Sequence, residues 1–290
     1  PVQVETVCWI SASKIVLSTF FYLSALICYI QYMRNSKWQY LLASVVSSIL
    51  AMGCKEQSVI IVPCLLLFDW MLFKRNMRSL KVYIEKVYYL IPAIAIFIVT
   101  LVANKDTGEE IIGYTIVDRF IFLCYSVFKY LLISAIPFKL SYLYPFPFQV
   151  GEKIPMALWI YPFVILFIGY VIYLNCTKPL LVFCTLFFIL HLLPVLHVIP
   201  LPRYVVVADR YLYIPYIAFA IGLSILSYHL YERQRKWILY AGFLYCSYLC
   251  VYTASYAPAW KNSDTLKEHF KEVLKKRETN LSINFKHEKQ

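Results

Sequence analysis

"SSILAMGCKEQSVIIVPCLLLFDW" (residues 47–70) consists of two apolar runs separated by the charged pair Lys55 and Glu56. An ionisable group at the centre of a bilayer costs about 2.5–3.5 kcal/mol on insertion, so such a pair is expected near the membrane surface. The stretch therefore predicts two antiparallel transmembrane helices joined by a short charged turn. That turn is either a functional site or a local ion pair in which Lys55 reaches water beside Glu56.

The composition of the whole chain is typical of a membrane protein. Of its 290 residues, 61% are hydrophobic and 15% are charged. Because a backbone in lipid must satisfy its own hydrogen bonds, we expect an all-α, polytopic membrane helix bundle. Eight apolar runs are close to the length that crosses a bilayer: Ile15–Met33, Trp38–Cys54, Ser58–Phe73, Val87–Ala103, Met156–Leu174, Pro179–His197, Tyr216–Tyr231 and Trp237–Ser255.

The charges between these runs predict the orientation of the chain. Loops rich in Lys and Arg lie on the cytoplasmic side of membranes, so the net charge of +12 indicates topology and gives no reason to expect nucleic acid as a partner. Four loops carry eleven Lys or Arg residues and two acids: Arg34–Lys37, Lys74–Lys86, Asn175–Lys178 and Glu232–Lys236. The acidic loop Lys105–Asp118 would then face the outer or lumenal side.

Residues 119–137 break this alternation, because a span there would invert every later loop. Ser126, Tyr130 and Ser134 follow one another at intervals of four, which places them on one helical face with Lys129 beside them. This pattern favours a helix that lies in the outer interface or re-enters, with a ninth span as the alternative. The nine cysteines fall mostly in apolar runs without metal-ligand spacing and are interpreted as packing residues, so no metal site is expected.

Two further polar segments are expected on the same outer face as Lys55. The first, "PVQVETVCWISASK" (residues 1–14), carries Glu5 and Lys14, and the second, "PRYVVVADRYLYIP" (residues 202–215), carries Arg203 and Asp209 followed by Arg210, Tyr211 and Tyr213. The tyrosines alone would suit an aromatic belt at the membrane surface. For three other polar residues we expect structural roles. Asp69 would form a local ion pair with Lys74 or Arg75, and His191 and His197 would be hydrogen-bonded packing residues.

Charges brought to a membrane surface by several loops suit a charged lipid headgroup. Lys and Arg bind phosphate, apolar helices accommodate an isoprenoid tail, and cations stabilise the charge of a leaving phosphate. Transfer to a hydroxyl also needs a carboxylate that accepts a proton. Glu5, Glu56 and Asp209 are the acids available on that face.

The order "PVQVETVCWISASK", "CKEQSVIIVPCLLLFDW", "YLYPFP", "VVADRYLYIP" and "WKNSDTLKEHF" resembles the membrane part of a known family over nearly the whole chain. This family is the GT-C glycosyltransferases fused to tetratricopeptide repeats, which includes protein O-mannosyltransferases and bacterial relatives. The resemblance implies transfer of a sugar, usually mannose, from a polyprenyl- or dolichyl-phosphate donor to an acceptor hydroxyl on protein. It divides the chain into a GT-C-like membrane domain (residues 1–258) and the start of a repeat region (residues 259–290) that would hold the protein acceptor.

The resemblance also assigns roles to residues. Lys55 and Arg210 would bind the donor phosphate, while Glu5, Lys14, Glu56, Asp209, Tyr211 and Tyr213 would support the site. The family's catalytic acids lie in a loop upstream of residue 1, so the catalytic residue stays unknown and this chain alone is expected to be inactive. A divalent metal requirement is left open. This chain departs from the family pattern at Ser13 and Ile15, because the family usually has a second basic residue and an acid at these two positions.

Two other functions remain open. A non-catalytic membrane platform that presents a repeat domain predicts no effect of a lipid-linked sugar on stability. A transporter of lipid-linked sugars predicts polar residues at mid-depth in several spans and discontinuous helices. We expect the chain in a bacterial inner membrane or in the membrane of the endoplasmic reticulum. Its composition, which is rich in Tyr, Phe and Ile, favours the bacterial inner membrane.

Overall fold

The computed structural model describes residues 1–103, 113–141, 144–174, 178–197, 205–233, 235–269 and 271, with the side chains of residues 232–236 left aside. This part of the chain is helical, and its one β feature is an isolated antiparallel bridge between Tyr144 and Val207. The α-helices are α1 (Val4–Cys8), α2 (Ser13–Asn35), α3 (Trp38–Cys54), α4 (Ile61–Met71), α5 (Leu80–Ala103), α6 (Ile116–Ala135), α7 (Ile160–Leu174), α8 (Pro179–Leu192), α9 (Pro215–Arg233) and α10 (Arg235–Tyr256). Short 3-10 helices connect them: η1 (Ile10–Ala12), η2 (Glu56–Ile60), η3 (Met156–Trp159), η4 (Leu193–Val195), η5 (Asp209–Leu212) and η6 (Ala257–Trp260).

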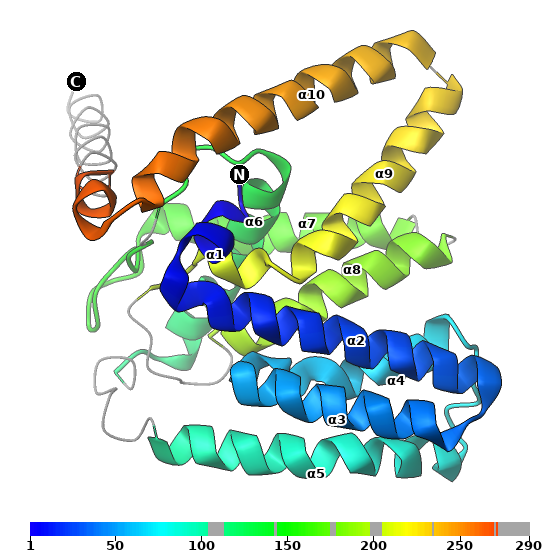
Figure 1. Ribbon diagram of the computed structural model, residues 1–290. Coiled ribbons are helices and arrows are strands. Elements are labelled where there is room, and N and C mark those ends of the chain that lie inside the picture. Colours follow the sequence, from blue (N-terminus) through cyan, green and yellow to red (C-terminus); the bar gives the residue numbers. More distant parts are fainter. Residues whose placement is uncertain are drawn as a thin grey trace, which may run out of the picture.

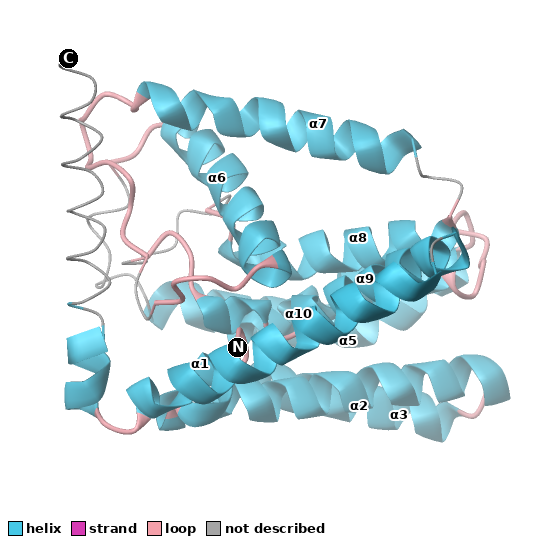
Figure 2. Ribbon diagram, turned by 90° about the horizontal axis from the view of Figure 1, so that it is seen from above, coloured by secondary structure: helices cyan, strands magenta, loops and turns pink. Residues whose placement is uncertain are grey.

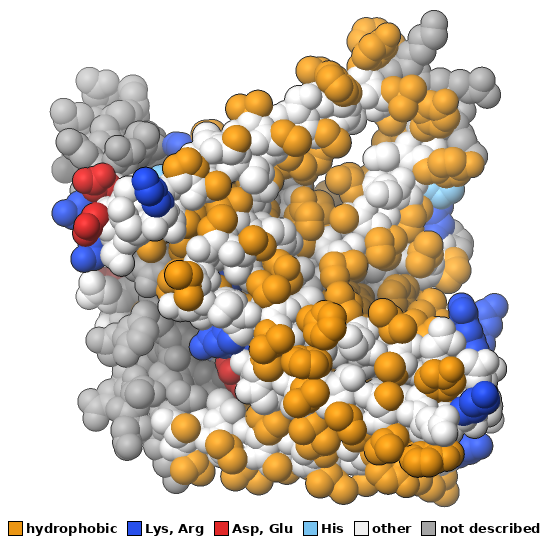
Figure 3. All heavy atoms as spheres, viewed as in Figure 1, with side chains coloured by type: hydrophobic (Ala, Val, Ile, Leu, Met, Phe, Trp, Pro, Cys, Tyr) orange, Lys and Arg blue, Asp and Glu red, His pale blue; other side chains and the backbone are white. Residues whose placement is uncertain are grey.

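The helices form a bundle that has apolar side chains on its outer surface as well as in its buried core. In Figure 1, α2, α3, α4, α5 and α8 run alongside one another, while α9 and α10 form a V on one side. Hydrophobic side chains cover most of the surface over these helices, and Lys and Arg gather at the end where α2 turns into α3 (Figure 3). An apolar outer surface with charges at the ends is that of a helix bundle in lipid.

The predicted count of eight spans is not established by the helix lengths. Four described helices are long and apolar enough to cross a membrane: Ile10–Asn35, Leu80–Ala103, Met156–Leu174 and Trp237–Trp260. The other predicted spans are shorter, since Trp38–Cys54, Pro179–Val195 and Pro215–Tyr231 have 10–17 residues and α4 has only 11. The loop predicted at Lys74–Lys86 is also shorter, because α5 begins at Leu80.

Small residues allow α2 and α3 to pack closely. The Ser44 hydroxyl donates to the Ala25 carbonyl across the helix pair at 2.7 Å, and the Ser18 hydroxyl donates to the Ala51 carbonyl at 2.8 Å. Small side chains and hydroxyls are the usual means by which helices associate in lipid. Because Ala51 lies one turn before the end of α3, the second contact places Lys55 beside the beginning of α2.

Lys55 ends α3 by leaving the helical conformation. Its backbone is extended, with φ −152° and ψ 120°, and the chain then continues as the 3-10 helix η2 into α4. The charged turn predicted between two antiparallel helices is therefore present, although its second arm is a 3-10 turn followed by a short α-helix.

Helix α6 crosses the direction of the bundle. Figure 2 shows it running obliquely to α2, α3, α7 and α8, and it is not among the helices apolar enough to span. The interfacial or re-entrant helix at residues 119–137 stays a prediction. The reason given for it was wrong, since the face formed by Ser126, Tyr130 and Ser134 is fully buried within the protein. Ser126 donates to the Val206 carbonyl at 3.3 Å, and the Tyr130 hydroxyl accepts from the Ala208 amide at 3.3 Å.

Several predicted features lie outside the described residues. They include Arg203, the acids of the Lys105–Asp118 loop other than Asp118, and nearly all of the predicted repeat region after residue 269. Within the described part, α10 leads through η6 into a helical stretch at residues 263–269. Helix α1 contacts η6, so the described beginning and end of the chain lie at the same end of the bundle (Figure 1).

Candidate functional site

Arg210 is held by a carboxylate from the other end of the chain. Its Nη1 donates to Oε1 of Glu5 at 2.7 Å, and its backbone amide donates to Oε2 of the same residue at 2.9 Å. The guanidinium carbon lies 5.7 Å from the ring centre of Trp9 and 5.1 Å from that of Tyr211. A fully buried carboxylate and two aromatic rings therefore fix the position of this cation.

The segment before Arg210 is fixed by a β-branched run. Val205, Val206 and Val207 favour extended backbone, and the Val206 amide donates to the Tyr144 carbonyl at 3.0 Å in the isolated bridge. All three valines are buried. The chain then turns at η5, and Pro215 begins α9, so Arg210 sits in a turn with rigid elements on both sides.

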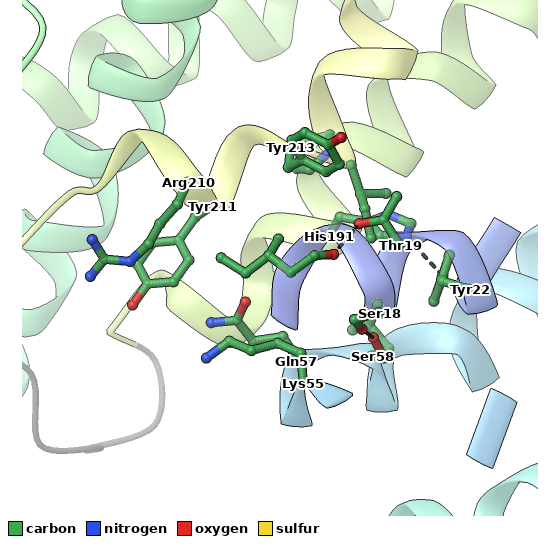
Figure 4. A pocket seen from close by; sticks show the side chains of 14 residues that line it. Ser18, Thr19, Tyr22, Lys55, Gln57, Ser58, His191, Arg210, Tyr211 and Tyr213 are labelled. Carbon is green, nitrogen blue, oxygen red and sulfur yellow. Dashed lines mark hydrogen bonds between the residues drawn. The ribbon is translucent and has the colours of Figure 1, made fainter. Parts of the chain in front are cut away.

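Lys55 and Arg210 line the same pocket. This pocket is also lined by Tyr211, Tyr213 and Gln57, and its volume is about 40 Å³. In Figure 4 the side chains of Lys55 and Arg210 extend from two different segments toward the same side of the picture. Lys55 is not free there, because its Nζ lies 2.8 Å from Oε1 of Glu56.

The inner wall of the pocket is polar and internally bonded. The Ser58 hydroxyl lies 2.7 Å from that of Ser18, which itself donates to the Ala51 carbonyl. His191 Nδ1 lies 2.8 Å from the Phe187 carbonyl, which can only accept, so Nδ1 carries the proton. His191 Nε2 then accepts from the Tyr22 hydroxyl at 2.8 Å. The prediction that His191 is a hydrogen-bonded packing residue is confirmed, and His197 likewise bonds the Val206 carbonyl.

Asp209 is adjacent to this pocket but does not line it. Its side chain is buried, and neither carboxylate oxygen makes a hydrogen bond of normal geometry within the described part of the chain. Of these two acids, which were both expected to support the site, Glu5 pairs with Arg210, whereas Asp209 forms no ion pair among the described residues. The two residues differ because η5 turns the Arg210 side chain toward α1 and away from its neighbour in sequence.

Burial and neighbouring charges set the protonation of the acids at this site. Burial raises the pKa of Asp209 well above its ordinary value, and the nearby Glu5 carboxylate raises it further. Burial also raises the pKa of Glu5, although Arg210 opposes that shift. Burial would raise the pKa of Glu56 as well, but the Lys55 ammonium outweighs it and the pKa is lowered.

The predicted site residues do not all gather in one place. Lys55, Arg210, Tyr211 and Tyr213 line the pocket, and Glu5 and Glu56 each pair with one of its two cations. Lys14 is exposed and lies outside the pocket lining, where its charge still contributes to lowering the pKa of Glu56.

A second polar cluster lies between α2, α4 and α5 and was largely missed. Asp69 is fully buried and accepts hydrogen bonds from Lys86 Nζ at 2.7 Å and from the Tyr29 hydroxyl at 2.6 Å. Arg75 bridges Asp69 and Glu85. Pairing between neighbours in sequence correctly predicted Arg75 as a partner of Asp69. Lys86 and Tyr29 are too distant from Asp69 in sequence to be predicted in this way. Their presence as polar residues among apolar ones was the available signal.

The described residues contain no group of three or more His, Cys, Asp or Glu side chains arranged to hold a metal ion. The eight cysteines in this part of the chain are free thiols. No family model, curated protein or solved structure matches this chain.

Proposed function

We propose that this chain is the membrane part of a glycosyltransferase that takes a sugar, in the first place mannose, from a polyprenyl-phosphate-linked donor. The acceptor would be a hydroxyl, on protein Ser or Thr, at the outer or lumenal side. One observation carries the proposal: Lys55 and Arg210, from distant parts of the sequence, line one pocket at one end of a membrane helix bundle. Two cations beside apolar helices suit a phosphate attached to a lipid.

Both cations already have a carboxylate partner, which defines how an anion would bind. Glu5 contacts Arg210 through one guanidinium nitrogen, so other donors of the planar guanidinium can reach a phosphate. Lys55 has three donors and its pair with the half-exposed Glu56 is weak, so its amine can turn to an anion. Glu5 in this proposal is a positioning residue for Arg210, and Lys55 is the mobile partner.

The small pocket volume limits what lies inside it. About 40 Å³ is room for a few water molecules, so the pocket would take phosphate oxygens while the sugar and the lipid tail lie outside it. Neither buried acid is placed to accept a proton from an acceptor hydroxyl, because Glu5 is engaged by Arg210 and Asp209 does not line the pocket. The catalytic base is therefore not assigned to a described residue.

We also propose eight spans for this domain. The four long apolar helices would be joined by α3, α8 and α9 and by the continuous stretch from Ser58 in η2 to the end of α4. An even number of spans returns the chain to its starting side, which agrees with the contact of α1 with η6. The catalytic end would be the one that holds Lys55 and Arg210, opposite the basic loops.

Binding of a lipid phosphodiester tests the phosphate site directly. The probe is farnesyl methyl phosphate, and its affinity for the chain in lipid nanodiscs is measured for the unsubstituted protein and for K55M and R210Q. We expect binding that both substitutions weaken at least about tenfold, as for loss of a charge-assisted contact. K37M, at the opposite end of α2, is the matched control. Equal affinity in K55M, R210Q and K37M would contradict the proposal.

Sugar transfer is tested in the full-length protein. Transfer of mannose from dolichyl phosphate mannose to a Ser/Thr peptide, which releases dolichyl phosphate, should be lost in K55M and in R210Q while membrane insertion is retained. Activity retained in both variants would exclude the two residues as donor ligands. No specific observation favours the platform or the transporter. A transport path needs polar groups at mid-depth in the membrane, whereas the buried charges Asp69 and Lys86 lie within about two turns of helix ends.

A further inference from the structure

Asp209 is the buried acid that the proposed phosphate site does not use. It is 1% exposed, and its two oxygens lack hydrogen bonds of normal geometry among the described residues. Burying an ionised carboxylate without partners is so unfavourable that such groups either find a cation or bind a proton. The cation next to it in sequence, Arg210, directs its guanidinium to Glu5.

The groups around Asp209 offer it little compensation. Glu5 repels a negative charge on it, whereas Arg210 attracts one. The other neighbours are phenols, and the hydroxyl of Tyr144 favours the ionised form more than Arg210 does, although burial and Glu5 outweigh both. The ionisable side chains that face Asp209 from the elements packed against it are Glu5, Tyr144, Arg210, Tyr252 and Tyr256.

The charge balance at the pocket depends on whether Asp209 is ionised. With Asp209 neutral, the cations Lys55 and Arg210 are matched by Glu5 and Glu56. With Asp209 ionised, the same group carries one excess negative charge, on the residue next to Arg210 in the chain. An incoming phosphate would meet that charge at a site whose two cations are largely buried, where electrostatic interactions are stronger than in bulk water.

We propose that Asp209 holds a proton in the resting protein and that this proton keeps Arg210 able to bind an anion in the pocket. Asp209 is then a positioning residue that acts through Arg210 and links anion affinity to pH. This inference rests on the proposed phosphate site and adds that the protonation of Asp209 controls the affinity of that site. The argument is carried by the burial of the side chain, by the absence of an ion pair from its oxygens among the described residues, and by its place beside Glu5 and the phenols.

The test measures the affinity of farnesyl methyl phosphate from about pH 5 to about pH 9 in nanodiscs. A phosphodiester keeps a single negative charge throughout this range, so the probe itself does not titrate. We expect the affinity of the unsubstituted chain to fall roughly fivefold or more as pH rises, a typical size for coupling between two sites. D209N, which has the shape of the neutral acid, should bind with an affinity that no longer depends on pH.

The outcomes separate this inference from the phosphate site on which it rests. Binding that is independent of pH in the unsubstituted chain, or an unchanged pH dependence in D209N, overturns the proton link alone. Absence of probe binding at every pH overturns the phosphate site and the link together. If D209N does not fold, the infrared carbonyl band of a protonated carboxylic acid in the unsubstituted chain decides the question. That band must disappear over the pH range in which affinity falls, and its absence at low pH contradicts the inference.

Discussion

Arg210 and Glu5 are 205 positions apart in the chain, yet two hydrogen bonds join them, one from the guanidinium and one from the backbone amide. The pair connects η5 to α1 and leaves the Arg210 side chain 19% exposed at the pocket. A buried carboxylate that contacts both the side chain and the backbone of one residue fixes the direction of that side chain. The position of the cation in the pocket thus depends on an element at the beginning of the chain.

Removing the charge of Glu5 should destabilise the protein. E5Q leaves Arg210 without its counter-charge, and breaking a largely buried ion pair costs about 3 kcal/mol. The free energy of unfolding is measured by loss of helical circular dichroism in a titration with SDS. E268Q removes an exposed acid and serves as the control, with an expected change near zero. Equal stability of E5Q and E268Q would show that the pair contributes nothing.

The cluster around Asp69 should contribute to stability as a unit. K86M leaves the buried Asp69 with Tyr29 and the longer contact to Arg75, and we expect a loss of about 3–5 kcal/mol in the same titration. K81M, an exposed lysine of the same helix, is the matched control. The double variant D69N/K86M should lose less than the sum of the single variants, because the two residues are in contact. Additive losses would mean that the two side chains do not interact.

Freeing Lys55 should strengthen anion binding. In E56Q the Lys55 amine no longer pairs with a carboxylate, so farnesyl methyl phosphate should bind about twofold to fivefold more tightly, the range for an exposed ion pair. Isothermal titration calorimetry in nanodiscs measures this change. Weaker binding in E56Q would instead indicate that Glu56 contacts the ligand or holds Lys55 in its binding position.

The same pair predicts a response to acid. Because the pKa of Glu56 is lowered in the folded protein, its pairing stabilises the protein above the ordinary value of about 4.5 and is lost as pH falls through the lowered pKa. The unfolding midpoint of the unsubstituted chain should therefore decrease more steeply below about pH 4.5 than that of E56Q. Parallel pH profiles for the two proteins would show that Glu56 is not part of the acid response.

The Tyr22 hydroxyl should be needed as the hydrogen-bond donor to His191. Y22F removes the hydroxyl that donates to His191 Nε2 in the pocket wall, and an unsatisfied buried acceptor costs about 1–3 kcal/mol. Stability is again measured by SDS titration, with Y173F as control because Tyr173 is 71% exposed. A stability of Y22F equal to that of Y173F would mean that water replaces the hydroxyl at no cost.

Local patterns were sufficient for the class of fold. Long apolar runs predict helices, because lipid offers no hydrogen bonds to the backbone, and the charged turn at Lys55 and Glu56 follows from the cost of charges in lipid. The pairing of Lys55 with Glu56 was also predictable, since the two residues are adjacent. Helix lengths were less predictable, as α4 and α5 show, because propensity alone does not determine where a helix begins.

The tertiary structure decided which polar residues meet. The face of α6 formed by Ser126, Tyr130 and Ser134 looked suited to a membrane surface, but it packs inward and holds residues 206–208. Asp69 has Lys86 as its close partner, because the packing of α4 against α5 brings them together over 17 positions. Periodicity specifies that a helix has a polar face, whereas the neighbouring elements determine what that face contacts.

By itself, the sequence of this protein determined a helical membrane bundle with basic loops at one end and a charged turn at Lys55. Only the tertiary structure placed Arg210 in one pocket with Lys55. Only the tertiary structure also showed that Glu5 and Asp209 have different partners. Glu5 pairs with Arg210, while Asp209, the residue next to Arg210 in the chain, is buried and forms no ion pair with it. The physical reason is that hydrophobicity acts on every residue locally, whereas the partner of a buried charge depends on how distant helices pack.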